Sequence, residues 1–240
     1  DFAVFPVNTA VKLYNAGPGY RLGGVTGLGT FSILSRDRAV TSWESLVGTT
    51  VFSTGKGATP DYLLTYFAEQ RGLNITSDFS HNNAAQLAQL ALAGKVDTVL
   101  LPEPFVSMVL SGSPEMRVVI DFQEEWNRLE GASTAYPVTV VTVNPRLAEE
   151  RPETVKAFLR ACRESVAWVK ENPGEAGVLI EKYGILKASA AAAAIPKSNL
   201  VFIPAAEAKE SLEPFLEVLL SYDPASLGGV LPDEGFYFED

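Results

Sequence analysis

The sequence is poor in the residues that build metal centres, disulfides and nucleophilic catalysts. Its 240 residues include one cysteine and one histidine. Cys162 alone excludes an internal disulfide and a cysteine-rich metal site, and its apolar helical surroundings predict a buried structural thiol. His81 has no second histidine or carboxylate cluster beside it, so it is expected to be an exposed loop residue. No apolar run reaches the roughly 18–20 residues that a membrane span needs.

Positive charge is also scarce. The chain has 19 basic and 29 acidic residues, a net charge of −10, which argues against a nucleic-acid-binding face. Its composition, 47% hydrophobic and 20% charged, is that of an ordinary globular protein. The length allows one large or two modest domains with a substantial core.

The order of apolar segments predicts an α/β fold. Short buried strands, such as 2–6, 50–53 and 98–101, alternate with helices of about 10–20 residues, which favours largely parallel sheets. After Asn144 the pattern becomes mostly helical. No long Pro/Ser/Gly linker divides the chain, so a second domain is expected to be joined by strands that cross directly. The best candidates are 30–36 and 137–143.

The stretch FSTGKGATPDYLL, residues 52–64, reads as a strand end, a glycine-rich turn and a helix. It does not have the G-x-x-x-x-G-K-[ST] spacing of a phosphate-binding P-loop. It also lacks the last glycine of the dinucleotide fingerprint G-x-G-x-x-G, as does the segment that begins at Gly27. Both nucleotide-binding interpretations are therefore disfavoured.

A simpler interpretation of this turn survives. A small-residue turn at a helix N-terminus offers unpaired N–H groups and the positive end of a dipole to a ligand. Lys56 adds a cation, and Thr54 and Thr59 add hydroxyl groups. The competing interpretation is structural, with Thr59 as a plain N-cap before Pro60 at the first helical position.

A second candidate is LPEPF, residues 101–105. Glu103 follows a buried strand at the edge where ligands of open α/β sheets bind. Its carboxylate could bind an amine or cation, or could cap the helix that starts near Pro104. Trp126 and Tyr136, in a stretch expected to be rich in loops, could face a cleft or simply pack.

Five segments resemble the solute-binding proteins of ABC importers, namely DFAVFPVNTAVKLYN, STGKGATPDYLL, LAGKVDTVLLPEPF, NPRLAEERPETVKAFL and LPDEGFYF. The resemblance runs over nearly the whole chain and is nearest to the nitrate, sulfonate, taurine and thiamine-precursor branch. It implies a type 2 periplasmic-binding-protein fold, with two α/β lobes that close on a solute. Lobe one would hold 1–32 and 141–240, and lobe two 33–140.

The resemblance also implies a set of cleft residues and no cofactor or metal. The expected ligand contacts are Asn8, Gly27, Gly29, Thr30, Thr54, Gly55, Lys56, Gly57, Ala58, Thr59, Glu103 and Pro104. The implied partners are a small solute and the ABC permease of the inner membrane. The implied location is the outer side of that membrane, either free in a periplasm or tethered by a lipid.

Members of this family normally begin further upstream than Asp1, with the first strands of lobe one. We therefore expect the chain to be an incomplete version of a longer protein, or to form an oligomer or exchange strands between copies.

Two other functions remain open. One is a cofactor-biosynthesis enzyme on the same fold, for which His81 and Glu103 form no recognised catalytic set. The other is the effector-sensing domain of a regulator, although the chain shows no helix-turn-helix segment. Lys56 and the helix N-terminus favour an anion, whereas Glu103 and the aromatic residues suit a ring that bears an amine.

Overall fold

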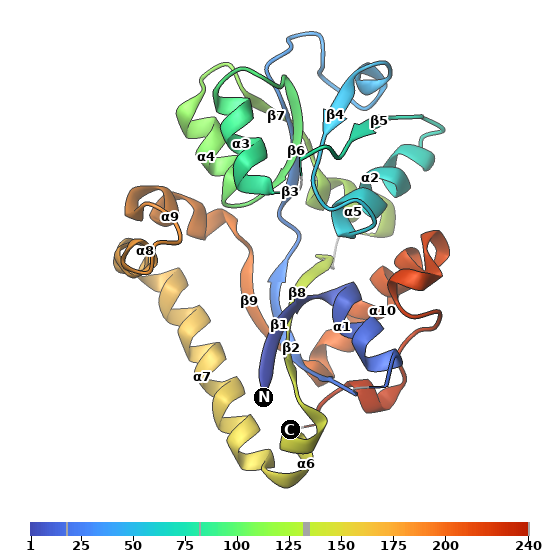
Figure 1. Cartoon of the computed structure of the whole chain (residues 1–240), viewed down its shortest axis with the longest axis vertical. Helices are drawn as coiled ribbons and strands as arrows, with labels where there is room; N and C mark the ends of the chain where they lie inside the picture. Colours follow the sequence, from blue (N-terminus) through green and yellow to red (C-terminus); the bar gives the residue numbers. More distant parts are fainter. Residues whose placement is uncertain (18, 82, 132–134, 240) are drawn as a thin grey trace. The chain divides into compact units, whose positions relative to one another are not determined.

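The structure is a computed structural model that describes residues 1–17, 19–81, 83–131 and 135–239. The chain divides into two compact units, each with one sheet and its own helices (Figure 1). Unit 1 consists of Asp1–Gly29, Thr134–Asn172 and Asn199–Asp240; unit 2 consists of Thr30–Ser133 and Pro173–Ser198. This arrangement confirms the predicted α/β class.

The predicted lobe boundaries stay a prediction. The contact-based units differ from them chiefly at residues 173–198, which group with unit 2 although the sequence prediction placed them in lobe one. Helix α9 in this segment contacts helix α4 of unit 2, and α8 packs on α9. The alanine-rich sequence of α9 does not indicate which of the two units the helix packs against.

Unit 1 is built on a four-stranded sheet of order β1-β8-β2-β9. Its strands are β1 (Phe2–Pro6), β8 (Pro137–Val143), β2 (Arg21–Leu28) and β9 (Leu200–Pro204). Its helices are α1 (Val7–Asn15), α6 (Pro145–Glu150), α7 (Pro152–Glu171) and α10 (Ala205–Tyr222), with 3-10 turns η3 (Pro224–Ser226) and η4 (Glu234–Phe236).

Unit 2 is built on a five-stranded sheet of order β5-β4-β6-β3-β7. Its strands are β5 (Thr76–Asp78), β4 (Thr50–Phe52), β6 (Thr98–Pro102), β3 (Phe31–Ser35) and β7 (Arg117–Asp121). Its helices are α2 (Thr59–Glu69), α3 (Ala84–Leu92), α4 (Phe105–Gly112), α5 (Phe122–Glu130), α8 (Pro173–Lys182) and α9 (Ala188–Ala194), with 3-10 turns η1 (Glu44–Leu46) and η2 (Ile195–Lys197).

The prediction of largely parallel sheets is wrong. In unit 1, β8 runs antiparallel to both β1 and β2, and β2 runs antiparallel to β9. In unit 2, β4 is parallel to β5 and β6, whereas β3 is antiparallel to β6 and β7. A buried apolar run shows that both faces of a strand are covered, but it carries no information on the direction of the strand.

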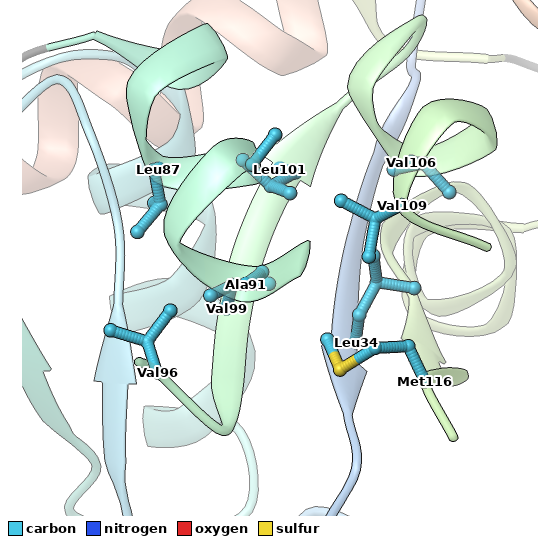
Figure 2. Close-up of a cluster of buried hydrophobic side chains, with 10 residues drawn as sticks. Leu34, Leu87, Ala91, Val96, Val99, Leu101, Val106, Val109 and Met116 are labelled. Carbon is cyan, nitrogen blue, oxygen red and sulfur yellow. The ribbon is translucent and has the colours of Figure 1, made fainter. Parts of the chain in front are cut away.

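The core of unit 2 lies between its sheet and helices α3 and α4 (Figure 2). Leu87 and Ala91 of α3 are four residues apart, and Val106 and Val109 of α4 are three apart, so each pair lies on one face of its helix. These side chains pack with Leu34 of β3, and all five are buried. Their removal from water is the main stabilising term for this layer.

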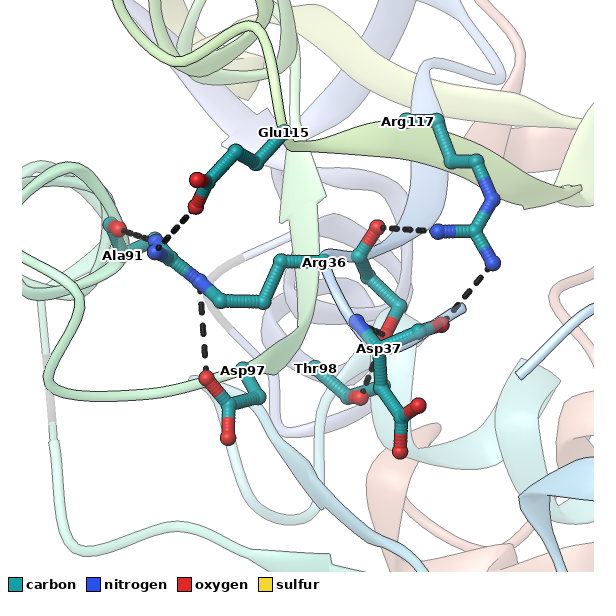
Figure 3. Close-up of polar contacts among 8 residues, drawn as sticks. Arg36, Asp37, Ala91, Asp97, Thr98, Glu115 and Arg117 are labelled. Atoms are coloured by element: carbon teal, nitrogen blue, oxygen red, sulfur yellow. Dashed lines mark hydrogen bonds and ion pairs between the residues drawn. The ribbon is translucent and has the colours of Figure 1, made fainter. Parts of the chain in front are cut away.

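Two arginines, Arg36 and Arg117, form hydrogen bonds and ion pairs at the amino-terminal edge of the parallel strands in unit 2 (Figure 3). Arg36 donates to the Ala91 carbonyl and lies 3.4 Å from carboxylate oxygens of Asp97 and of Glu115. Arg117 donates to the carbonyls of Ser35, Asp37 and Val40 at 3.2, 2.8 and 2.7 Å. Both arginines therefore hold together segments of the fold at this edge, through the Ala91, Ser35, Asp37 and Val40 carbonyls and the two carboxylates.

Two helix starts lack a side-chain cap although polar residues lie beside them. Helix α1 begins at Val7 after Pro6, and neither Asn8 nor Thr9 caps it. The segment after Thr41 forms only the 3-10 turn η1, where the Ser45 hydroxyl accepts from the N–H groups of Thr41 and Ser42.

Candidate functional site

Most of the predicted site residues of unit 2 lie at one edge of its sheet. Because β4, β5 and β6 are parallel, their carboxyl ends share this edge, and the antiparallel β3 begins there. Thr30 precedes β3, and its carbonyl accepts from the Glu103 N–H at 3.0 Å. The turn from Thr54 to Thr59 follows β4, the neighbour of β6. This is the edge at which ligands of open α/β sheets bind.

The turn between β4 and α2 requires its two glycines. Gly55 and Gly57 have φ angles of +74° and +70°, in the left-handed region that residues with a Cβ rarely adopt. The Ala58 N–H donates to the Gly55 carbonyl at 2.9 Å, which closes the turn directly before the helix. The glycine pattern in the sequence therefore has a local structural reason in addition to any ligand.

Thr59 is not the N-cap of α2. The helix begins at Thr59, its N-cap residue is Ala58, and no side chain caps it. Thr59 is 3% exposed, and its Oγ1 atom is buried without a hydrogen-bond partner among the described residues. A buried hydroxyl left unpaired costs about 1–3 kcal/mol. The structural interpretation of this threonine is therefore wrong, and its hydroxyl remains to be explained.

The charges at this helix start are mixed. Lys56 is exposed, and within the described ranges it makes no ion pair. Asp61, in the first turn of α2, accepts the Gly57 N–H at 2.9 Å, so that backbone donor is already used. The sequence analysis did not single out Asp61, although an acidic residue in the first turn is a known helix-start signal.

Glu103 acts on its own helix. Its two carboxylate oxygens accept from the Ser107 N–H at 3.0 Å and the Ser107 hydroxyl at 2.9 Å. This geometry satisfies a free donor in the first turn of α4, and it favours the capping role over the binding of a cation. Pro104 is the N-cap residue of that helix.

The site residues of unit 1 also lie at one sheet edge. Pro6 of β1 and Gly27 of β2 pair with Thr139 from opposite sides, so Asn8, at the start of α1, shares an edge with Gly27. Asn8 is 7% exposed, and its Oδ1 atom is buried with no hydrogen-bond partner in the described part of the chain.

One of the two glycines of this group has a structural reason of its own. A Cβ on Gly27 would lie 2.5 Å from the Thr139 Oγ1, so a side chain here would force Thr139 of β8 to move. The carbonyl of Gly29 accepts from the Asn199 side chain at 2.5 Å, a bond that any residue at this position could make.

The remaining candidates pack rather than form a reactive cluster. Trp126 and Tyr136 are buried, the first in helix α5, which the sequence analysis expected to be loop, and the second stacked on Phe215. His81 is half-buried rather than exposed as predicted, with its ring centroid 6.3 Å from that of Phe52. Cys162 is half-buried rather than fully buried as predicted, because it lies on α7 beside exposed positions, and burial raises the pKa of its thiol.

The described residues lack two further kinds of feature. No group of three or more His, Cys, Asp or Glu side chains is placed to hold a metal ion there. Within the same ranges, no helix combines the length and the apolar character that a membrane crossing requires.

Most of the described chain matches a known family. Residues 27–176 match the model of the family described as NMT1/THI5 like. This chain belongs to the NMT1/THI5-like family. The matched segment includes the last two residues of β2, the whole sheet of unit 2 and the turn before α2.

Solved structures share the fold of this NMT1/THI5-like chain over its length. An ABC transporter protein from Parabacteroides distasonis is 28% identical, with a TM-score of 0.84 over 100% of this chain and 81% of the other. The periplasmic aliphatic sulphonate-binding protein SsuA from Escherichia coli is 20% identical, with a TM-score of 0.70 over 90% and 74%. These matches confirm the predicted type 2 periplasmic-binding-protein fold.

The same fold also occurs in an enzyme. The desulfurization enzyme DSZB is 17% identical, with a TM-score of 0.61 over 97% of this chain and 83% of the other. Among curated proteins, none matches the chain. The fold by itself therefore does not separate transport from catalysis.

Proposed function

We propose that this chain is the solute-binding component of an ABC importer, and that it binds a small anionic solute without transforming it. Family membership and the match to an ABC transporter protein over the whole chain support this role. The importer role implies a membrane permease as partner and a location outside the cytoplasmic membrane. Attachment through a lipid would be compatible with the same role.

The observation that carries the proposal is the start of α2. A helix N-terminus without a side-chain cap presents the positive end of its dipole, and the buried Thr59 hydroxyl there has no partner among the described residues. Lys56 adds a mobile positive charge two residues upstream of Ala58. An oxyanion that accepts from the Thr59 hydroxyl would satisfy the dipole, the cation and the unpaired group together.

Asn8 narrows the expected solute. Its buried Oδ1 atom is an acceptor, so it calls for a hydrogen-bond donor on the solute. A solute that carries an amine or hydroxyl group supplies such a donor. SsuA from Escherichia coli is named for binding aliphatic sulphonates, which makes a sulfonate the first class to test. We propose the same set of ligand contacts that the sequence predicts, with Glu103 serving mainly to hold α4.

The test is a titration of the protein with taurine, alkanesulfonates, nitrate, thiamine precursors and amino acids, followed by thermal unfolding and calorimetry. A true solute at 100 times its Kd should add about 2.7 kcal/mol to the free energy of unfolding. The solute should be recovered unchanged by chromatography. A solute that is bound but recovered chemically altered would favour the enzyme interpretation, and the absence of binding by every compound would contradict the proposed class.

A further inference from the structure

A cavity lies within unit 1, and neither Asn8 nor Gly27 lines it. It has a volume of about 320 Å³ and lies among helix α7, strand β9 and the start of α10, and α7 packs on β9 (Figure 1). The cavity is lined by Gly23, Lys156, Leu159, Arg160, Arg163, Phe202, Pro204, Ala205, Ala206 and Phe238. Three of these residues are basic and none is acidic. This balance is notable in a chain with a net charge of −10.

The three cations lie along one face of a helix. Lys156, Arg160 and Arg163 are spaced four and three residues apart on α7, which makes them neighbours on the helix surface. Like charges at this spacing repel one another. Lys156 has a weak ion pair with Glu153 at 3.8 Å, and within the described ranges neither arginine has one. The positive charge of the two arginines is therefore not neutralised by an ion pair within the described residues.

The cavity also has an apolar wall. The guanidinium of Arg163 lies 5.5 Å from the centroid of the Phe202 ring, a cation–π contact that fixes one cation at the cavity. Leu159 and Phe238 are buried beside it, 5% and 7% exposed. A ligand with a charged head and a planar or apolar body matches this division between basic and aromatic lining.

We propose that this cavity binds a phosphate group, as a small phosphate monoester whose body lies against Phe202. Arginine forks bind phosphate oxygens in pairs, and three cations suit a head with two negative charges. The first backbone groups of α10, an 18-residue helix without a side-chain cap, border the cavity at Ala205 and Ala206 and add the positive end of a dipole. This site is independent of the importer role proposed above.

The test uses phenyl phosphate and inorganic phosphate as probes in calorimetric titrations at low salt. The double variant Arg160→Gln with Arg163→Gln should bind phenyl phosphate at least about tenfold more weakly than the wild-type protein. The matched control, Arg146→Gln with Lys170→Gln, removes the same charge from exposed positions of unit 1 that do not line the cavity, and should bind normally. Equal weakening in both double variants would show diffuse attraction and would overturn the proposal.

A third variant tests the space in the cavity without changing its charge. Ala206 is exposed at the cavity, so Ala206→Phe should fold, fill part of the space and weaken binding of phenyl phosphate more than that of inorganic phosphate. Unchanged affinity for both probes would overturn the proposed location. Thermal unfolding of each variant shows whether it is folded. The arginine variant should bind the importer's solute with unchanged affinity, so a failure of this proposal can be told apart from a failure of the importer proposal.

A phospholipid headgroup offers the same phosphate chemistry. Sedimentation with phosphatidylcholine vesicles, with and without phosphatidic acid, distinguishes the two sources. Soluble phenyl phosphate alone should bind if the ligand is a small molecule. Binding only to the vesicles with phosphatidic acid, lost in the arginine variant, would support the same site with a lipid as its ligand. No binding in either arm would overturn the site.

Discussion

Unit 2 contains two kinds of helix start at the same edge of its sheet. Helices α3 and α5 are each capped by the side chain that precedes them, Asn83 and Asp121, which accept from two N–H groups of the first turn. At the start of helix α4, the carboxylate of Glu103, two residues before the helix, accepts from the N–H and the hydroxyl of Ser107. Helix α2 has no side-chain cap, and Thr59 at its start keeps a buried hydroxyl without a partner in the described residues.

The difference indicates where a ligand can contribute. At a capped start the first-turn donors are satisfied by the fold, so the side chain there stabilises the protein and leaves little for a ligand. At the start of α2 the fold leaves the hydroxyl unsatisfied, a cost that a bound solute can offset. Unit 1 repeats the contrast, since Asn144 caps α6 whereas α1 is uncapped and contains the unpaired Asn8.

The largest expected effect is at a capped start. Asp121→Ala removes an acceptor for the N–H groups of Gln123 and Glu124, at 2.8 and 3.1 Å, together with a negative charge at a helix N-terminus. We expect a loss of about 2 kcal/mol in the free energy of unfolding, measured by urea denaturation. Asp121→Asn, which keeps the acceptor oxygen, should retain most of the stability. Neither variant should change the affinity for the solute; weaker solute binding without loss of stability would contradict the division between the two kinds of helix start.

The sequence predicts some helices and strands better than others. The short strands β1, β4 and β6 were expected close to their observed bounds, and a helix was expected after the glycine turn, where α2 lies. Gly72 and Gly94, with φ angles of +66° and +67°, follow helices α2 and α3. Strands β5 and β9 were not expected. Their length is not the reason, because β4 is as short as β5 and β1 as short as β9; each forms a strand by pairing with a neighbour, and the sequence does not show that pairing.

Helix α5 and the site show a second limit of the sequence. The segment 122–130 is mostly polar, and its two buried residues, Phe122 and Trp126, are four residues apart, too few to establish a period. The position of the turn from Thr54 to Thr59 at a helix start could be predicted from its glycines. That Thr59 is left without a partner depends on which residue begins the helix and on how tightly it packs, and a sequence pattern contains neither.

The next effect is at the uncapped start. Thr59→Val keeps the shape of the side chain and removes the hydroxyl, so the affinity for the solute should fall about tenfold, or about 1.4 kcal/mol. Without solute, the free energy of unfolding should stay the same or rise by up to about 1 kcal/mol, because an unsatisfied buried group is lost. Thr65→Val, at an exposed position of the same helix, is the matched control for both measurements. A destabilised Thr59→Val with normal solute binding would mean that the hydroxyl has a structural role.

The smallest effect concerns a buried hydroxyl away from any helix start. The Tyr237 hydroxyl also has no hydrogen-bond partner among the described residues, and burial, helped by the carboxylates of Glu213 and Glu234, raises its pKa to about 12. The usual value of about 10 applies in the unfolded chain. Between these values the folded protein keeps a proton that the unfolded chain has lost, so this group's contribution to stability is present below pH 10 and is lost as the pH rises toward 12.

Tyr237→Phe should therefore reduce the loss of stability in this alkaline range, as measured by urea denaturation at several pH values. Tyr183→Phe, at a position 73% exposed, should leave the alkaline loss as it is in the wild-type protein. Solute affinity should be unchanged in both variants, unlike that of Thr59→Val, because neither tyrosine is among the proposed ligand contacts. Weaker solute binding in Tyr237→Phe would contradict the use of an unpaired buried hydroxyl to identify a solute contact. The difference between the helix starts would then depend only on whether a side chain caps them.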